Sequence, residues 1–246
     1  MQALTAEQLL ALWESGRSQM PAQRALALLA AACPESSLES IAALSIGRRD
    51  AGLLRLREWA FGSRIAGISD CPQCSERLEM SFTTDDIRAG EGNESSDSLS
   101  LVVEHYEISF RLPNSLDLIV MTMAGGEDRA TLRQTLTDRC VLHARHHDAE
   151  IASSQLPESV IVALSQRMAE ADQQSDVRLA LDCPRCKHRW EALFDIVSFF
   201  WSEIDAWARR VLREIHTLAS AYGWPERDIL AMSAGRRAIY MAMLAA

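Results

Sequence analysis

The residues of this chain that could do chemistry are four cysteines in two matching motifs. Asp70-Cys71-Pro72-Gln73-Cys74 returns 112 positions later as Asp182-Cys183-Pro184-Arg185-Cys186. The copies stay in register beyond the cysteines, where Arg77, Glu79 and Phe82 match Arg189, Glu191 and Phe194. Each Cys-Pro-x-Cys offers two thiolates about one turn apart, and two such turns supply the four sulfur ligands of a tetrahedral structural zinc. We therefore predict two halves of one zinc ribbon, separated by 108 residues.

Two other interpretations of these cysteines remain open. A thiol-disulfide redox centre also uses Cys-x-x-Cys, with a thiolate pKa that is lowered at a helix N-terminus, and cysteines can pair as disulfides. Here each motif leads into a strand-like run, at 78–82 and 190–194, and a redox enzyme needs only one such pair. The sequence therefore favours one zinc ion per chain, bound by Cys71, Cys74, Cys183 and Cys186. Cys33 and Cys140 lie in apolar, helix-like contexts typical of core residues.

Composition limits the classes of protein to consider. The chain has 246 residues, of which 48% are hydrophobic and 24% charged, as in a soluble protein of one to three compact units. No run approaches the ~18 apolar residues that span a bilayer. The first five residues do not resemble a signal peptide, so we expect a reducing, cytoplasmic location that again favours zinc over disulfides. A formal charge of −9 opposes a large nucleic-acid-binding surface, because such binding depends on clustered Lys and Arg.

The elements that must position the cysteines are mostly helical. Thr5 and Gln8 form the pattern of a capping box, and helices are predicted at 6–16, 21–32, 38–47 and 50–59. We expect a mainly α fold with a small β zinc ribbon (α+β), in which a long, mostly helical insertion splits the ribbon. The predicted units are an N-terminal helical unit (1–68), the split ribbon (69–83 plus 177–194), the insertion (84–176) and a C-terminal long helix with a helical pair (195–246).

The insertion has its own character. Residues 85–107 carry seven acidic side chains and one basic one, which predicts an acidic, solvated loop. A strand or hairpin arm is predicted at 101–110, and helices at 116–123, 128–145 and 157–171. On the second of these helices, His143, His146 and His147 could hold another metal. No carboxylate partner is evident, and cationic side chains also suit the C-terminal end of a helix.

The C-terminal part shows the strongest helical periodicity of the chain, at 199–222. Gly223 can take the left-handed cap and Pro225 can open the next helix, so a final helical pair is predicted at 226–232 and 234–244. The chain has no nucleophile elbow, phosphate loop, dinucleotide fingerprint or His-Glu-x-x-His. Four cysteines would also close the coordination sphere of the zinc, so we expect a structural metal and no enzyme activity.

Several stretches in this order resemble a family of contractile-tailed phages and phage-tail-like injection systems of bacteria. They lie at 44–50, 54–58, 61–62, 71–74, 110–118, 183–186, 199–204, 215–230 and 236–240, and the most telling contains Tyr222-Gly223-Trp224-Pro225. The C-terminal part resembles baseplate-hub proteins, which implies a role in assembling the hub. The resemblance covers most of 40–246 except the acidic loop. Relatives tend to carry glycine directly after each cysteine pair, where this chain has Ser75 and Lys187.

The first functional hypothesis is a zinc-stabilised structural or chaperone protein of a contractile baseplate, with baseplate or tail proteins as partners, cytoplasmic or retained in the particle. Tyr222, Trp224, Arg236 and Arg237 would form its partner surface, since aromatic and Arg side chains dominate interfaces. Trp224 could instead only pack the helical corner, and the two arginines could lie on a solvated helix face. The alternatives are a zinc-ribbon regulator that binds nucleic acid and a thiol oxidoreductase.

Overall fold

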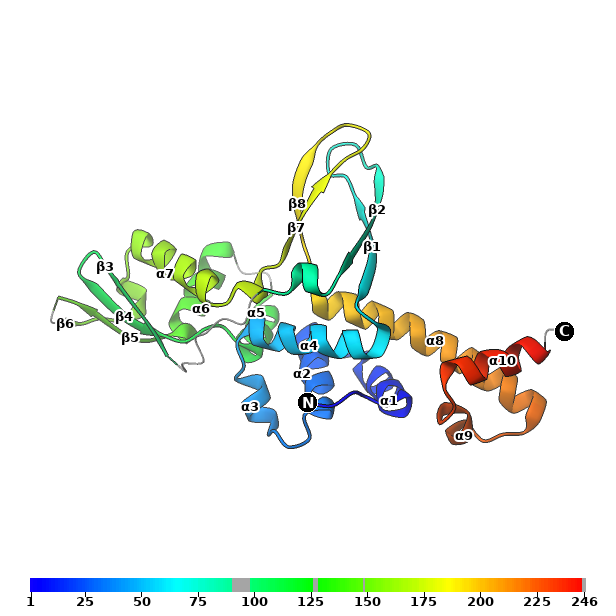
Figure 1. The fold of residues 1–246 in the computed structure, drawn as a ribbon. Coiled ribbons are helices and arrows are strands. Elements are labelled where there is room, and N and C mark those ends of the chain that lie inside the picture. The colour runs from blue at the N-terminus through cyan, green and yellow to red at the C-terminus, as the bar shows by residue number, and fades with distance from the viewer. Residues whose placement is uncertain (90–97, 126–127, 148, 245–246) are drawn as a thin grey trace.

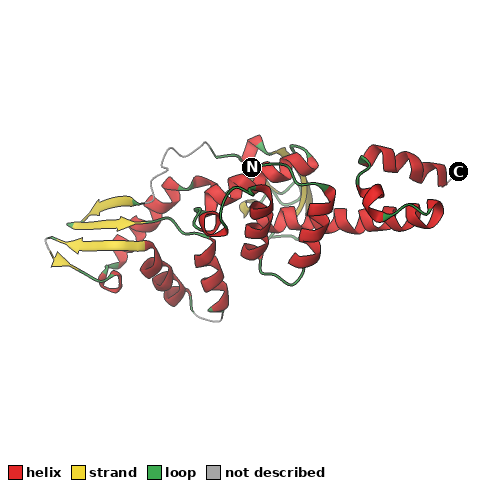
Figure 2. Ribbon diagram, turned by 90° about the horizontal axis from the view of Figure 1, so that it is seen from below, coloured by secondary structure: helices red, strands yellow, loops and turns green. Residues whose placement is uncertain are grey.

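The computed structural model describes residues 1–89, 98–125, 128–147 and 149–244. A group of N-terminal helices forms the centre of the molecule, and two β-hairpins project from it side by side (Figure 1). A four-stranded sheet lies at one end of the molecule and the C-terminal helices lie at the other (Figure 2). The fold is therefore mainly helical with small antiparallel sheets, which confirms the predicted α+β class.

Four helices build the N-terminal body: α1 (Ala6–Gly16), α2 (Pro21–Ala32), α3 (Leu38–Ala42) and α4 (Ile46–Phe61). The capping box predicted at Thr5 and Gln8 is present. The prediction of one helix at 38–47 and another from residue 50 is wrong. Ser45 takes an extended conformation and accepts a hydrogen bond from the backbone N–H of Arg48, so it caps α4 at Ile46 and separates this helix from α3.

Two separate hairpins carry the cysteine motifs between their strands. Strand β1 (Arg64–Asp70) pairs with β2 (Arg77–Thr83), and β7 (Arg178–Asp182) pairs with β8 (Arg189–Leu193), both antiparallel. Strand β1 begins at Arg64, directly after α4, and Ile65 on this strand is fully buried in the N-terminal core. The first hairpin is therefore anchored to the helical body through its first strand.

The insertion holds a four-stranded antiparallel sheet in the order β3 (Leu99–Val103), β4 (Tyr106–Phe110), β5 (Val141–His146) and β6 (Ala149–Glu150). Its helices are α5 (Ser115–Met123), α6 (Arg129–Cys140) and α7 (Glu158–Ala171), with 3-10 turns at Asp85–Ile87, Ser153–Gln155 and Gln173–Ser175. The predicted hairpin arm and the helices at 116–123 and 157–171 are confirmed. Much of the acidic loop expected at 85–107, namely residues 90–97, lies outside the described residues.

The helix predicted at 128–145 ends at Cys140, and residues 141–146 form β5 instead. Ala144 pairs with Ile108 of β4, and both side chains are buried against α7. A strand partner for β4 and a buried apolar face outweigh the helical pattern here, as tertiary context often does. The predicted histidine group on a helix end is therefore wrong. His146 stacks on Tyr106 of β4, and His147 lies in the following turn against His105.

The C-terminal part consists of α8 (Ile196–Tyr222), α9 (Glu226–Leu230) and α10 (Ala234–Leu244), close to the prediction. Gly223 ends α8 with φ 69°, the left-handed cap that its position predicts. The first half of α8 packs into the N-terminal core, and the second half packs against α9 and α10 through Val211, Ile215 and Leu218. None of the helices within the described residues is long and apolar enough to cross a membrane.

A buried polar contact joins the end of the insertion to the N-terminal body. One carboxylate oxygen of Asp172 accepts a hydrogen bond from the hydroxyl of Ser45 at 3.0 Å, and the other accepts one from the backbone N–H of Gly47 at 2.8 Å. Asp172 therefore satisfies a free N–H in the first turn of α4, where a negative charge also suits the helix dipole. A side chain at position 47 would collide with this carboxylate, which explains the glycine.

We expect Gly47→Ala to lower the free energy of unfolding by roughly 1–3 kcal/mol, because the new methyl displaces the capping carboxylate. Gly235→Ala is the matched control, since a side chain at position 235 of α10 meets open space. That variant should be neutral or stabilise the protein by less than about 1 kcal/mol. Urea unfolding of both variants measures the difference, and equal stability of the two would contradict the role given to Asp172.

Candidate metal centre

The two cysteine motifs adopt the same backbone geometry. In the first, the N–H of Cys71 donates to the carbonyl of Glu76 and the N–H of Ser75 donates to the carbonyl of Cys71, both at 2.9 Å. In the second, Cys183, His188 and Lys187 repeat this pattern at 2.9 and 3.0 Å. Each turn leaves one residue in the left-handed region, with φ 56° at Ser75 and 61° at Lys187. Glycine takes this conformation without strain, which accounts for the glycine expected at these places.

We expect glycine at position 75 or 187 to be tolerated. A residue other than glycine in the left-handed region costs about 1–2 kcal/mol, and glycine removes this cost. The gain is partly offset, because glycine loses more backbone entropy on folding. Lys187→Gly should therefore leave the melting temperature unchanged or slightly raised. Lys187→Val places a β-branched residue in the same region and should lower it. Thermal unfolding of the two variants measures the contrast, and a higher melting temperature for the valine variant would contradict the turn geometry.

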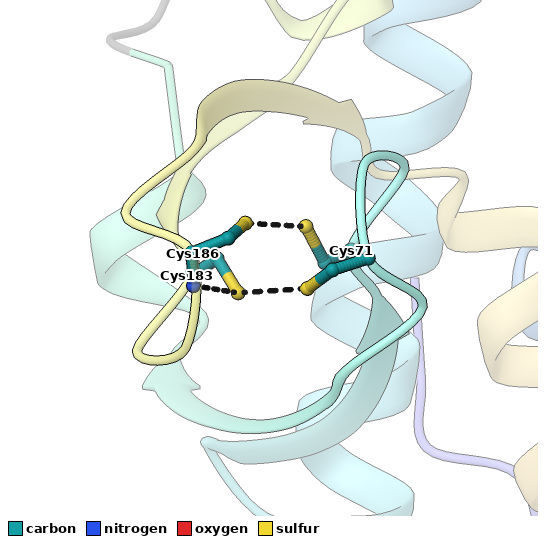
Figure 3. A group of neighbouring side chains, drawn as sticks. Cys71, Cys183 and Cys186 are labelled. Atoms are coloured by element: carbon teal, nitrogen blue, oxygen red, sulfur yellow. Dashed lines mark hydrogen bonds between the residues drawn. The ribbon is translucent and has the colours of Figure 1, made fainter.

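The four sulfur atoms converge between the two turns (Figure 3). Sγ of Cys71 lies 3.7 Å from Sγ of Cys186, and Sγ of Cys74 lies 3.6 Å from Sγ of Cys183. All four sulfurs lie within 4.8 Å of one another. Within the described residues, no other group of three or more His, Cys, Asp or Glu side chains lies so close together. A tetrahedral zinc with bonds of about 2.3 Å to sulfur requires edges of about 3.8 Å. The cluster therefore fits a four-sulfur metal site.

The arrangement does not fit a set of disulfides. The sulfur separations of 3.6 and 3.7 Å are well beyond the roughly 2.05 Å of a disulfide bond, and all four cysteines are free thiols. The short contacts also join the two motifs to each other, whereas a redox pair would join the two cysteines of one motif. The geometry thus brings together the four cysteines that the sequence predicts, across the 112-residue spacing.

The thiols of the cluster differ in acidity. The backbone N–H of Cys186 points at Sγ of Cys183 and lowers the pKa of that thiol to about 7. A hydrogen bond from the backbone of Glu76 favours the Cys74 thiolate, but burial and the three neighbouring thiols outweigh it and raise the pKa of Cys74 to about 12. Four thiolates so close together repel one another, so a bound divalent cation would supply the charge that lets all four ionise.

The two hairpins also contact each other outside the cluster. The rings of Phe82 and Phe194, which are equivalent in the repeat, meet edge to face at 5.6 Å between centroids. Arg185 of the second turn pairs with Glu76 of the first at 3.3 Å. Phe194 also contacts Phe199 at the start of α8. The second hairpin is thus connected directly to α8, the helix that runs through both the N-terminal and the C-terminal cores.

The residues predicted as a partner surface lie together at the corner between α8 and α10. Tyr222 and Trp224 stack at 4.5 Å between ring centroids, and Tyr240 meets Trp224 edge to face at 4.9 Å. Arg236 is exposed and lies over the ring of Tyr240. Arg237 differs, because it is only 4% exposed and donates to Glu214 of α8 and to the carbonyl of Met232. Its side chain holds α10 in place and is not available at the surface.

Buried charges that the sequence did not single out connect several of the motifs noted above. Arg57 is 2% exposed and donates two hydrogen bonds, at 2.8 and 2.6 Å, to Glu203 of α8. Asp117 is fully buried and accepts hydrogen bonds from Arg111, Arg139 and the backbone N–H of Asn114. The only signal in the sequence was that these charged residues stand inside apolar runs. The structure shows that the stretch at 54–58 pairs with the stretch at 199–204 through Arg57 and Glu203.

Fold and site define a helical protein whose distant segments meet at a four-cysteine cluster. The chain matches the family described as T4 bacteriophage base plate protein over residues 3–201, most of its length, and it belongs to that family. The resemblance to phage baseplate proteins is thereby confirmed, although the stretch at 215–230 lies beyond the matched range. A search of curated proteins and a search of solved structures each gave no match.

Proposed function

We propose that this protein is a non-enzymatic structural or chaperone component in baseplate assembly of a contractile phage tail or tail-like injection system. The observation that carries the proposal is the sulfur cluster in a member of a baseplate family. Four cysteines would occupy every position of a tetrahedral zinc and leave none for water or substrate. The zinc is then structural, and the cluster fixes how the body, the insertion and α8 meet.

The proposed role of the zinc follows from chain connectivity. The insertion leaves the first hairpin after β2 and returns to the second hairpin at β7. A metal bound by both turns would hold the two ends of the insertion together, and metal binding of this kind contributes folding free energy. The surfaces of the protein would then keep fixed positions relative to one another. A component that contacts several partners requires such an arrangement.

The partner surface is proposed at the corner that holds Tyr222, Trp224 and Arg236. Tyr222 is 37% exposed, and Trp224 is half-buried between two tyrosine rings, so both offer rigid aromatic area. Such side chains lose little conformational freedom on binding. Baseplate or tail proteins are the proposed partners, with the protein formed in the cytoplasm and either retained in the particle or released after assembly.

The test is a pull-down of tagged protein from a strain that produces the particle, with particle assembly followed by electron microscopy. Baseplate proteins should be recovered with the wild type, and Trp224→Ala should reduce both their recovery and the number of complete particles. Trp59→Ala is a matched control, because Trp59 is an exposed tryptophan on α4, away from the corner. Recovery of no baseplate protein with the wild type would contradict the proposed function.

Metal analysis separates the remaining candidates. The proposed function and a nucleic-acid regulator both require about one zinc per chain, whereas a thiol oxidoreductase requires a metal-free protein that reduces insulin. A regulator would also shift the mobility of DNA or RNA in a salt-dependent manner. We expect bound zinc, no reductase activity and no mobility shift.

A further inference from the structure

The outward side of α10 is an apolar helix face that stays exposed among the described residues. Arg237, Tyr240 and Met241 face α8 and its core. The opposite side follows the helical spacing i, i+3, i+4, i+7 and i+8, and all of its residues are exposed and apolar or small: Gly235, Ala238, Ile239, Ala242 and Met243. Ile239 and Met243 are 59% and 61% exposed. A solvent-facing helix side is normally polar, so this strip is suited to contact another molecule.

The shape of the strip suits a second helix. Its spacing is that of side chains that pack as ridges into the grooves of a facing helix. Gly235, Ala238 and Ala242 are small and allow close approach of the two backbones, while Ile239 and Met243 would insert into the partner. The corner also lies at the end of α8 that extends beyond the N-terminal body, where a partner can reach it (Figure 2).

Charge indicates the chemistry of the partner. From Asp205, the ion-pair partner of Arg209, to the end, the chain carries six arginines and four carboxylates, a formal charge of +2, whereas the rest of the chain carries −11. Arg236 borders the strip, and among the described residues it has no carboxylate partner. An acidic partner would be attracted to this end of the molecule and repelled by the rest, which fixes its orientation.

We infer that the outer face of α10 docks an amphipathic helix with acidic flanks that belongs to another baseplate protein, an inference that rests on the proposed function. A second copy of this chain fits less well. Two such corners would bring like charges together. A strip about 13 Å long on a helix about 11 Å across covers roughly 150 Å², far less than the roughly 800 Å² per partner of a stable interface. The contact is therefore suited to transient recognition during assembly.

The test places the photoreactive residue p-benzoylphenylalanine at position 242 of the full-length, metal-loaded protein in a producing strain, and mass spectrometry identifies the cross-linked peptide. The expected product is a baseplate protein linked through a segment with apolar residues at helical spacing and acidic flanks. Ile239→Glu with Met243→Glu should reduce the cross-link about tenfold or more, because both anchors of the strip are lost. Met123→Glu, at an even more exposed methionine on α5, should change it less than about twofold.

Arg236→Glu and added salt should also weaken the cross-link if the flanking charges are recognised. A cross-link to a second copy of this chain, to nucleic acid, or to a basic or non-helical segment would overturn the inference, and so would no cross-link at all. The pull-down described above distinguishes this failure from that of the proposed function. If the glutamate variants still recover baseplate proteins at the wild-type level, the function stands and the docking face is wrong.

Discussion

Cys183→Ser should abolish the proposed zinc binding and lower the melting temperature by at least about 10 °C. The physical reason is that structural zinc in small modules supplies on the order of 10 kcal/mol of folding free energy. A chain of this size loses about 2–4 °C for each kcal/mol. Cys183 is buried, and its sulfur contacts Cys74 of the other motif, so its loss removes a link between the two hairpins. Zinc content by atomic emission and thermal unfolding by circular dichroism measure the two effects.

Cys33→Ser is the control for this experiment, because Cys33 is a partly buried thiol far from the cluster in sequence and outside the four-cysteine group. It should retain about one zinc per chain. Treatment of the wild type with a strong chelator should reproduce the effect of Cys183→Ser, whereas the variant itself should no longer respond to the chelator. A wild-type protein with no metal, or a variant that keeps both its zinc and its melting temperature, would contradict a structural metal.

Asp117→Asn should lower the free energy of unfolding by about 3–5 kcal/mol, the usual effect of removing one partner from a buried ion pair. The carboxylate of Asp117 is fully buried and accepts hydrogen bonds at 2.7–2.9 Å from Arg111, Arg139 and the backbone N–H of Asn114. Asparagine offers one acceptor oxygen and turns an NH2 group toward donors. Chemical unfolding measures the difference, and the insertion should lose its protection from hydrogen exchange first.

The effect of Asp117→Asn should depend on pH. Burial on its own would raise the pKa of Asp117, but the hydrogen bonds from Arg111, Asn114 and Arg139 outweigh it and hold the pKa below its ordinary value. The stability that this group contributes is therefore complete above about pH 4, the pKa of an unfolded aspartate, and is lost as the pH falls through the folded pKa. The gap between wild type and variant should narrow below about pH 4.

The control is Asp70→Asn, which removes an exposed carboxylate that pairs with exposed Arg77 on the first hairpin. Surface pairs of this kind contribute between about 0 and 1 kcal/mol. If Asp117→Asn were no more destabilising than Asp70→Asn, the buried carboxylate would not be holding α5 and α6 together.

The sequence by itself determined the parts of this protein that depend on local chemistry. The spacing of Cys71, Cys74, Cys183 and Cys186 identified the cluster, because a tetrahedral site needs four ligands and each short turn supplies two. Local capping signals at Thr5 and Gly223 placed the ends of α1 and α8. Each cysteine turn and each helix cap is formed by residues a few positions apart, so it can be recognised without knowing the rest of the fold.

Only the tertiary structure decided the features that depend on contacts distant in sequence. Residues 141–146 form a strand because they pair with β4, although their hydrophobic pattern continues the helical pattern of α6. Arg237 is not part of the predicted partner surface, because its guanidinium is buried against Glu214, 23 residues earlier in the chain. The buried pairs of Arg57 with Glu203 and of Ser45 with Asp172 join segments more than 100 residues apart. Such pairings follow from how the elements pack, and no local pattern specifies them.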